Sequence, residues 1–166
     1  MAARVDTPVV LVRAGQPTVD PERGGREIVV GVETGQLADS VIDFAFTEAA
    51  LRGVRLRAVH ARTPLSPWPA LGWAPPRLEV TEQEEAEQAL LSEALVAWRR
   101  TYPEVALTAE VRLGSAAQSV LDAGRDADLI VVGRRERGRE LGPRLGSVAH
   151  AVLHHADSPV AVIPHR

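Results

Sequence analysis

From residue 27 onward, the apolar residues of the chain gather into five short runs, and the segments between several of them carry apolar residues at helical spacing. The runs EIVVGVE (27–33) and DLIVVG (128–133) are almost wholly apolar, which is typical of strands buried on both faces of a sheet. VRLRAVHA (54–61) alternates apolar and polar residues and predicts another strand. VALTAEVRLG (105–114) and SPVAVIP (158–164) complete the set of predicted strands.

The segment after the first run predicts an amphipathic helix. Ile42, Ala45, Phe46 and Ala49 recur at spacings of three and four residues and therefore share one face. Gly53 is placed to end this helix, because glycine adopts the left-handed backbone of a helix C-terminus at little cost.

Capping residues predict where later helices begin. Thr81 with Glu84, and Ser115 with Gln118, fit the capping box, in which two side chains three positions apart satisfy backbone N–H groups of the first turn. Gly146, which a serine follows, predicts the start of the last helix.

This alternation of strands and helices predicts an α/β fold: a doubly wound, five-stranded parallel sheet with helices on both faces. Counted from residue 27, the expected strand order is 3-2-1-4-5. Ligands bind such sheets at the carboxyl ends of the strands, where the strand order reverses. The loops to inspect are therefore those after Val32, His60 and Val132. We expect His60 itself to serve in packing or hydrogen bonding.

Composition narrows the classes of function. The chain has 166 residues, enough for one domain with a substantial core. A net charge of −3 argues against a general nucleic-acid binder, and no apolar run approaches the length of a membrane span. The absence of cysteine excludes disulfides, zinc–thiolate sites and thiol catalysis. We expect a cytoplasmic protein without a signal peptide, a metal site, a nucleic-acid partner or a membrane partner.

The stretch from Val131 to Ile163 carries the strongest signal for a ligand. A buried strand ends in Gly133, a long basic loop follows, and a helix opens at Gly146 and Ser147. The backbone N–H groups and the positive end of that helix predict a phosphate site. The loop arginines are Arg134, Arg135, Arg137, Arg139 and Arg144, which stand among Glu136 and Glu140. The alternative is a solvated, salt-bridged surface in which Ser147 only caps the helix.

The same stretch resembles the universal stress protein family, whose pattern is G-x-x-G, nine residues, then G-[ST]. The resemblance runs from about residue 27 to the end and includes IVVGV, EAALRG, VHA, VRLGS and ADLIVVG. It implies a universal stress protein domain over residues 27–166. In that family the loop wraps the phosphates and ribose of ATP.

The chain departs from this pattern at two positions. Glu136 stands where the second glycine would allow close backbone approach, and Glu33 stands where the family has an acid that is usually aspartate. We therefore expect a degenerate pocket. If binding is retained, the resemblance implies these nucleotide contacts: Val32, Glu33, Ala61, Val132, Gly133, Arg134, Arg135, Glu136, Gly146, Ser147 and Val148.

A repeated strand signature marks both ends of the chain. DTPVVLVRAG (6–15) and DSPVAVIPHR (157–166) share an acid, a small hydroxyl residue, a proline and a valine-rich run. The first copy and the Pro- and Gly-rich segment after it resemble the junction in tandem members of the family. The resemblance is therefore to the C-terminal domain of a tandem protein, and we interpret residues 1–26 as a strand and linker that are the remnant end of a preceding domain. We expect residues 5–15 to pair beside the last strand, in the same chain or in a dimer mate. A homodimer or pseudo-dimer would use the edge residues Val160, Ala161, Val162 and Ile163.

Our leading hypothesis is a non-enzymatic dimerisation or regulatory module in stress response, with no cofactor. The alternative is a stress protein that binds ATP with Mg²⁺, or another adenine nucleotide, and hydrolyses it slowly if at all. An enzyme of the ATP pyrophosphatase or electron-transfer flavoprotein type is a weaker alternative, because fold alone does not imply function. The Pro-rich loop at 63–80 is either a cover for apolar surface or a lid that binds an unidentified protein partner.

Overall fold

The computed structural model of the chain describes residues 7–12, 26–62, 77–135 and 145–165. The linker at 13–25, the Pro-rich stretch at 63–76 and the basic loop at 136–144 lie outside the described residues. The elements, in chain order, are β1 (Val9–Leu11), β2 (Glu27–Val32), α1 (Asp39–Arg52), β3 (Arg55–Arg62), α2 (Arg77–Ala94), α3 (Val96–Thr101), β4 (Leu107–Leu113), α4 (Ala116–Ala123), β5 (Leu129–Arg135), α5 (Ser147–His155) and β6 (Val160–His165).

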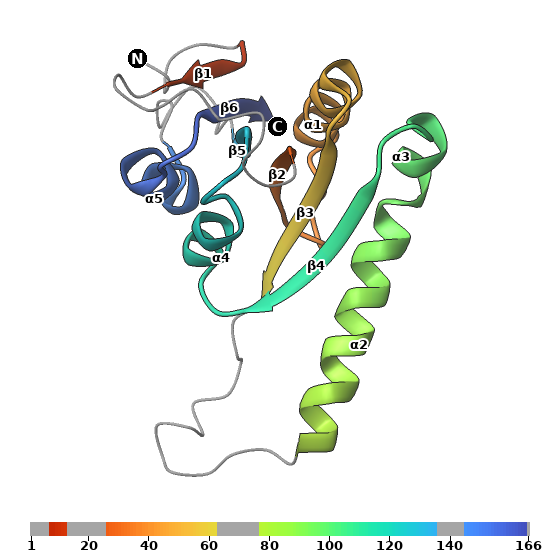
Figure 1. Cartoon of the computed structure of the whole chain (residues 1–166). Helices are drawn as coiled ribbons and strands as arrows, with labels where there is room; N and C mark the ends of the chain where they lie inside the picture. The colour runs from red at the N-terminus through yellow and green to blue at the C-terminus, as the bar shows by residue number, and fades with distance from the viewer. Residues whose placement is uncertain (1–6, 13–25, 63–76, 136–144, 166) are drawn as a thin grey trace.

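The described strands form one six-stranded sheet in the order β1-β6-β5-β2-β3-β4 (Figure 1). The strands from β2 to β6 pair in parallel and keep the predicted order. The predicted five-stranded sheet is thus confirmed in order and corrected in number, because β1 adds a sixth strand antiparallel to β6. β1 belongs to the segment that we expected to pair beside the last strand, and it does so within the same chain.

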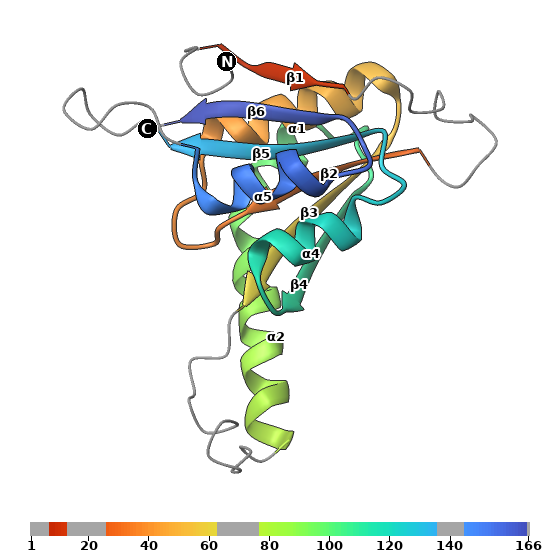
Figure 2. The ribbon, with the colours of Figure 1, turned by 90° about the vertical axis from the view of Figure 1, so that its left-hand side faces the viewer.

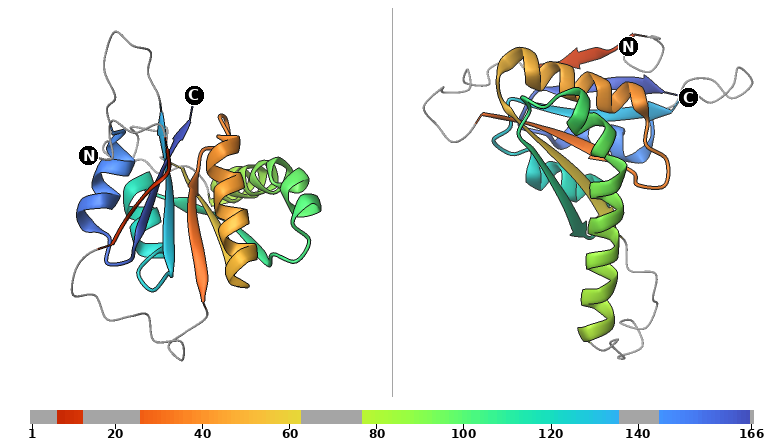
Figure 3. Two further views of the ribbon diagram at one scale, coloured as in Figure 1. Left: turned by 90° about the horizontal axis from the view of Figure 1, so that it is seen from above. Right: turned by 90° about the vertical axis from the view of Figure 1, so that its right-hand side faces the viewer.

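Helices cover both faces of the sheet, as predicted. Seen from above, α4 and α5 lie on one side of the strands, and α1, α2 and α3 lie on the other (Figure 3). Successive residues of a strand point to opposite faces, so β2 serves two cores. Ile28 and Val30 pack with α1, whereas Val29 packs with residues of α4 and α5.

The first helix forms as its apolar spacing predicts. Ile42, Ala45, Phe46 and Ala49 are all buried. Gly53 ends the helix with φ 61°, and its N–H points to the carbonyls of the last turn. A side chain would be strained in that conformation, so this glycine is required by the helix end.

The capping predictions have mixed outcomes. The Ser115 side chain accepts a hydrogen bond of 3.2 Å from the backbone N–H of Gln118, as expected. The predicted capping box of Thr81 and Glu84 does not start a helix, so this prediction is wrong. Helix α2 already begins at Arg77, directly after two prolines. Proline is compatible with a helix start, so the helix begins right after the two prolines, at Arg77 and not at Thr81. At the last helix the N-cap is Gly146, and Ser147 is the first helical residue.

The outer edge of β4 is covered by a side chain of α2, which runs beside this strand in Figure 1. The amide of Gln88 donates to the carbonyl of Ala109 at 2.9 Å and accepts from the N–H of Val111 at 3.2 Å. One side chain thus satisfies a donor and an acceptor that the edge strand would otherwise expose.

We expect Gln88→Met to lower the free energy of unfolding by about 1–2 kcal/mol, because two hydrogen bonds are lost while the length of the side chain is kept. Glu93→Met, at an exposed position of the same helix, is the control, with an expected change within about 0.5 kcal/mol. Urea unfolding measures both variants. Equal losses in the two would show that Gln88 does not protect the edge.

Candidate functional site

The crevice predicted by the strand order lies at the carboxyl ends of β2 and β5. These strands pair in parallel, from Ile28 with Leu129 to Val30 with Val131, so their ends meet at one edge of the sheet. In the sheet, β3 and β4 lie beyond β2 on one side of this central pair, and β6 lies beyond β5 on the other. The loop after β2 and the last residues of β5 therefore form the walls of the candidate site.

Arg135 spans this crevice. Its guanidinium donates a hydrogen bond of 2.6 Å to Oε1 of Gln36 and lies 3.7 Å from Oε2 of Glu33. Gln36 and Glu33 both belong to the loop after β2, whereas Arg135 ends β5. The ion pair is exposed and worth at most about 1 kcal/mol by itself, but the two contacts together hold the loop against the end of β5. Glu33, which stands where the family usually has aspartate, is thus paired with an arginine.

His60 holds the other side of the same loop. Its Nδ1 lies 3.1 Å from the carbonyl of Val32, and its Nε2 lies 3.5 Å from the hydroxyl of Thr34. A carbonyl can only accept, so Nδ1 carries the proton and donates. The prediction of a hydrogen-bonding role for His60 is confirmed, and Thr34 is a partner that the apolar spacing gave no reason to select.

Three of the nucleotide contacts that the resemblance implies, Val32, Ala61 and Val132, do not all face the same core. Val132 is only 2 % exposed and packs with residues of α4 and α5. Val32 packs against the core on the α1 side. Ala61 is half-buried and, by alternation along β3, shares the side of Val59 and Val132. The side chains of Val32 and Val132 thus pack on opposite faces of the sheet.

Gly133 has a packing reason to be glycine. A Cβ placed on it would lie 2.9 Å from the ring of His165 and 3.2 Å from Val41. The ring of His165 on β6 therefore fills the place beside the glycine that a side chain would need. Arg134, the next residue, is 2 % exposed, so its guanidinium is not displayed to solvent as a phosphate ligand.

The start of α5 retains the character of a phosphate site. Gly146 is the N-cap and makes no side-chain capping bond, and no atom lies within 4 Å of where its Cβ would be. Ser147 is exposed and Val148 is half-buried. The first N–H groups of the helix thus lack a capping side chain at Gly146, as a phosphate site requires. Glu136, Arg137, Arg139 and Arg144 of the predicted loop lie outside the described residues.

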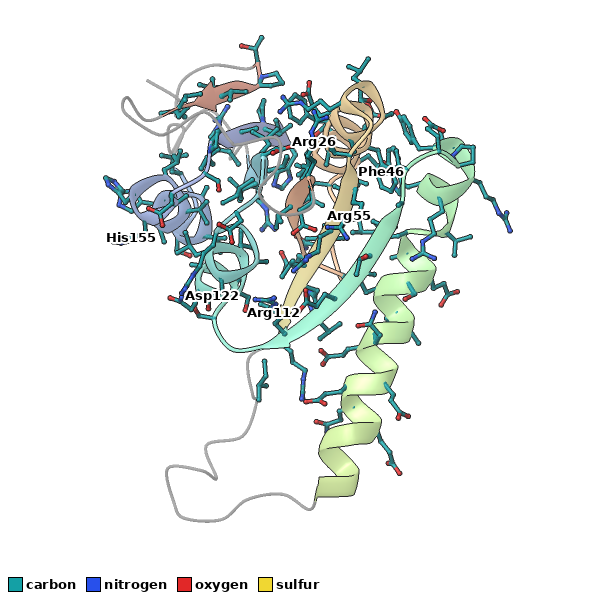
Figure 4. The ribbon with its side chains drawn as sticks, viewed as in Figure 1. Arg26, Phe46, Arg55, Arg112, Asp122 and His155 are labelled. Carbon is teal, nitrogen blue, oxygen red and sulfur yellow. The ribbon has the colours of Figure 1, made fainter. Side chains whose placement is uncertain are left out.

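Two open hollows lie away from this crevice. One is between α4 and α5 and is lined by residues that include Asp122, Arg125 and His155; the other is at the turn from β4 to α4, beside Arg112 and Ser115 (Figure 4). A hydrogen bond from Gln118, followed by Arg125 and Arg112, holds the pKa of Asp122 below its usual value. We give these hollows less weight than the crevice, because neither combines a strand-order reversal with a glycine-led helix start.

The described residues offer neither a cluster of metal ligands nor a membrane span. No three of their histidine, aspartate and glutamate side chains are grouped so as to hold a metal ion. The rings of His150 and His154 lie 4.5 Å apart between centroids on α5. None of the helices in the described ranges is long and apolar enough to cross a membrane.

Comparison with known proteins decides the family. The profile described as "Universal stress protein family" matches residues 25–164. The chain belongs to the universal stress protein family. Universal stress protein Rv1996 of Mycobacterium tuberculosis is 35% identical over 137 residues, which are 81% of this chain and 43% of that protein. Universal stress protein Rv2623 of the same organism is 34% identical over 157 residues, covering 93% of this chain and 50% of that protein. This universal stress protein chain therefore spans about half the length of the curated relatives it matches.

Solved structures of universal stress proteins share the fold. The protein from Archaeoglobus fulgidus in complex with dAMP is 27% identical, with a TM-score of 0.56 over 85% of this chain and 98% of that one. A universal stress protein from Pseudomonas aeruginosa is 20% identical, with a TM-score of 0.64 over 99% of this chain and 54% of that one. At that identity the second likeness shows the fold alone.

Proposed function

We propose that this universal stress protein domain is a non-enzymatic regulatory module whose nucleotide crevice is closed to ATP. One observation carries the proposal: Arg135 joins the end of β5 to Gln36 and Glu33 of the loop that faces it. A triphosphate entering between these walls has to displace the guanidinium from both partners.

Electrostatics add to the cost of that displacement. Once Arg135 turns to a phosphate, the Glu33 carboxylate loses its cation and stands beside further negative charge. Like charges at such short range raise the free energy of the complex, and because both side chains are exposed to solvent this repulsion amounts to about 1 kcal/mol or less. The burial of Val132 and Arg134 also supports a crevice without a ready pocket for the base or for the phosphates.

A second candidate function is the binding of an adenine mononucleotide. It is favoured by the likeness to the Archaeoglobus fulgidus protein, which forms a complex with dAMP. It is also favoured by the start of α5, where Gly146 makes no side-chain capping bond to the first N–H groups. A single phosphate could use that helix start while the Arg135 contacts stay in place.

Thermal unfolding with ATP, ADP, AMP and cyclic AMP, each with and without Mg²⁺, separates the two candidates. A ligand present at about 100 times its dissociation constant stabilises the native state by about 2.7 kcal/mol. For a chain of this size that raises the Tm by about 5–10 °C. We expect ATP at about 1 mM to change the Tm by less than about 1 °C, because a ligand far below its dissociation constant does not stabilise the native state.

The pattern of responses assigns the function. A rise with AMP or cyclic AMP, but not with ATP, supports the second candidate over the first. A rise with ATP of several degrees contradicts the closed crevice. Release of phosphate from ATP by the purified chain, lost in a heat-inactivated control, would contradict the non-enzymatic assignment.

A further inference from the structure

The first half of α2, residues 77–87, is attached to the domain differently from the second half. In the second half Leu91 is fully buried, and Gln88 bonds to the edge of β4. In the first half the side chains from Glu82 to Ala86 are all exposed. Figure 2 shows that the start of the helix extends past the ends of β3 and β4. The described side chains of the first half therefore lack the apolar packing that holds the second half.

Arg62, the last residue of β3, reaches this first half from the sheet. Its guanidinium donates a hydrogen bond of 3.1 Å to Oε1 of Gln83. The same guanidinium lies 3.5 Å from a carboxylate oxygen of Glu84, and its Nε lies 3.6 Å from Oε2 of Glu87. Residues three and four positions apart are neighbours on a helix surface, so Arg62 holds one turn of α2 against the end of β3.

The contact between Arg62 and Glu87 is incomplete. Nε of Arg62 and Oε2 of Glu87 are both buried, and neither has a hydrogen-bond partner among the described residues. The 3.6 Å between these two atoms is too long for a hydrogen bond. Buried charged groups that lack hydrogen bonds raise the free energy of the state in which they are buried. The attached state of the first half is therefore held less firmly than its number of contacts suggests.

Without Arg62 the first half of α2 has little to keep it helical. Glu82, Glu84, Glu85 and Glu87 place four negative charges on six residues that include no positive charge. Like charges three positions apart destabilise a helix, as between Glu84 and Glu87. A helix of about 12 residues without tertiary packing is only marginally stable in water.

We propose that the first half of α2 is an arm which Arg62 latches to β3, and that this arm releases and unwinds while the rest of the domain stays folded. A segment held by few apolar contacts opens locally at a lower free energy than the core. Release lengthens the connection that follows β3 from residues 63–76 to residues 63–87. Arg62 comes two positions after His60, which holds the loop of the candidate crevice. The latch thus gives the domain two states that differ beside the crevice and share one core.

Amide hydrogen exchange of the full chain, followed by mass spectrometry, tests the latch. In the wild-type chain we expect residues 82–87 to be at least about tenfold less protected than residues 90–95, since the two halves open separately. Arg62→Met keeps the apolar stem of the side chain and removes the guanidinium. In this variant the protection of residues 82–87 should fall by about a further tenfold, the size expected when hydrogen bonds to a charged group are lost. The protection of residues 90–95 should stay within about twofold of wild type.

Arg57→Met is the matched control, because Arg57 stands on the same strand and also forms ion pairs. Its partners are Glu27 at 3.0 Å and Glu110 at 3.7 Å, which lie on β2 and β4 and not on α2. This control should leave the protection of the arm unchanged. A charge swap tests the pairing itself: Arg62→Glu should lower the protection of the arm, and adding Glu87→Arg should restore part of it.

Three results would overturn the proposal: equal protection of the two halves of α2 in the wild-type chain, unchanged protection of the arm in Arg62→Met, or faster exchange throughout the domain in that variant. Should Arg62→Met fail to fold, Glu84→Ala with Glu87→Ala decides. Alanine favours the helix, so a loss of protection in that variant cannot come from helix propensity. A loss confined to the arm supports the latch, whereas an unchanged arm or a uniform loss contradicts it.

Discussion

Replacing Phe46 by alanine should lower the free energy of unfolding by about 3–5 kcal/mol, the cost of removing a large aromatic side chain from a packed core. Phe46 is fully buried on α1. Its ring stacks on Tyr102, with centroids 5.3 Å apart, and on Trp98, with centroids 6.0 Å apart. The hydroxyl of Tyr102 donates to Asp43 at 2.9 Å, which ties the end of α3 back to α1. Alanine would leave a cavity next to the Tyr102 ring. The hydrogen bond to Asp43 holds this ring in place, so the ring cannot easily move in to fill the cavity.

Urea unfolding followed by tryptophan fluorescence measures this change. With a slope of about 2 kcal/mol per molar urea, the midpoint should fall by about 2 M. Phe46→Leu is the matched control, because it keeps most of the volume, and it should cost no more than about 1.5 kcal/mol. A loss below about 1 kcal/mol in Phe46→Ala would show that the aromatic cluster does not hold α1 and α3 together.

Gly124→Ala should destabilise the chain by about 1–3 kcal/mol through overpacking. Gly124 is the C-cap of α4, and a Cβ there would lie 2.6 Å from Cγ1 of Ile130, close against its Cδ1, and 3.0 Å from the carbonyl oxygen of Val120. Ile130 is buried between β5 and α4, and the carbonyl is backbone, so neither can move away cheaply. The modest gain from a stiffer unfolded chain does not offset such a clash.

Gly35→Ala is the control for this substitution. No atom lies within 4 Å of the Cβ position of Gly35, so the unfolding free energy should change by no more than about 0.5–1 kcal/mol. Both variants are compared by thermal and urea unfolding. A Gly124→Ala chain as stable as Gly35→Ala would show that α4 can shift away from β5 without cost.

The fold was largely predictable because its signals are local. Continuous apolar runs mark the buried strands, and the stripe that ends at Gly53 marks α1; parallel strands joined by helices admit few topologies. The start of α2 was missed because Thr81 offers a capping pattern inside a segment that two prolines start earlier. The position of β1 was predictable only through its likeness to β6, since its own three residues are too few for a periodic pattern.

The sequence predicted which loops surround the candidate site, but it did not predict which side chains of those loops contact one another. The strand-order reversal selected the ends of β2, β3 and β5, which the sheet brings to one edge. That Arg135 reaches Gln36 and Glu33, 99 and 102 positions earlier, depends on how the ends of β2 and β5 meet, which no local pattern encodes. Gly133 shows a related limit. The family pattern in the sequence suggests that Gly133 is needed to bind a ligand. The fold shows a second reason, because a side chain on Gly133 would collide with the ring of His165.

The most direct test of the closed crevice is a calorimetric titration of Mg²⁺-ATP into the full chain and into the double variant Glu33→Asp, Glu136→Gly. The shorter acid should no longer reach Arg135, and the glycine restores the second position of the family pattern. We predict no measurable binding to the wild-type chain at ATP concentrations up to about 1 mM, a free energy weaker than about −4 kcal/mol, and binding that becomes measurable in the double variant. Micromolar binding of ATP to the wild-type chain, with no gain in the variant, would contradict the account.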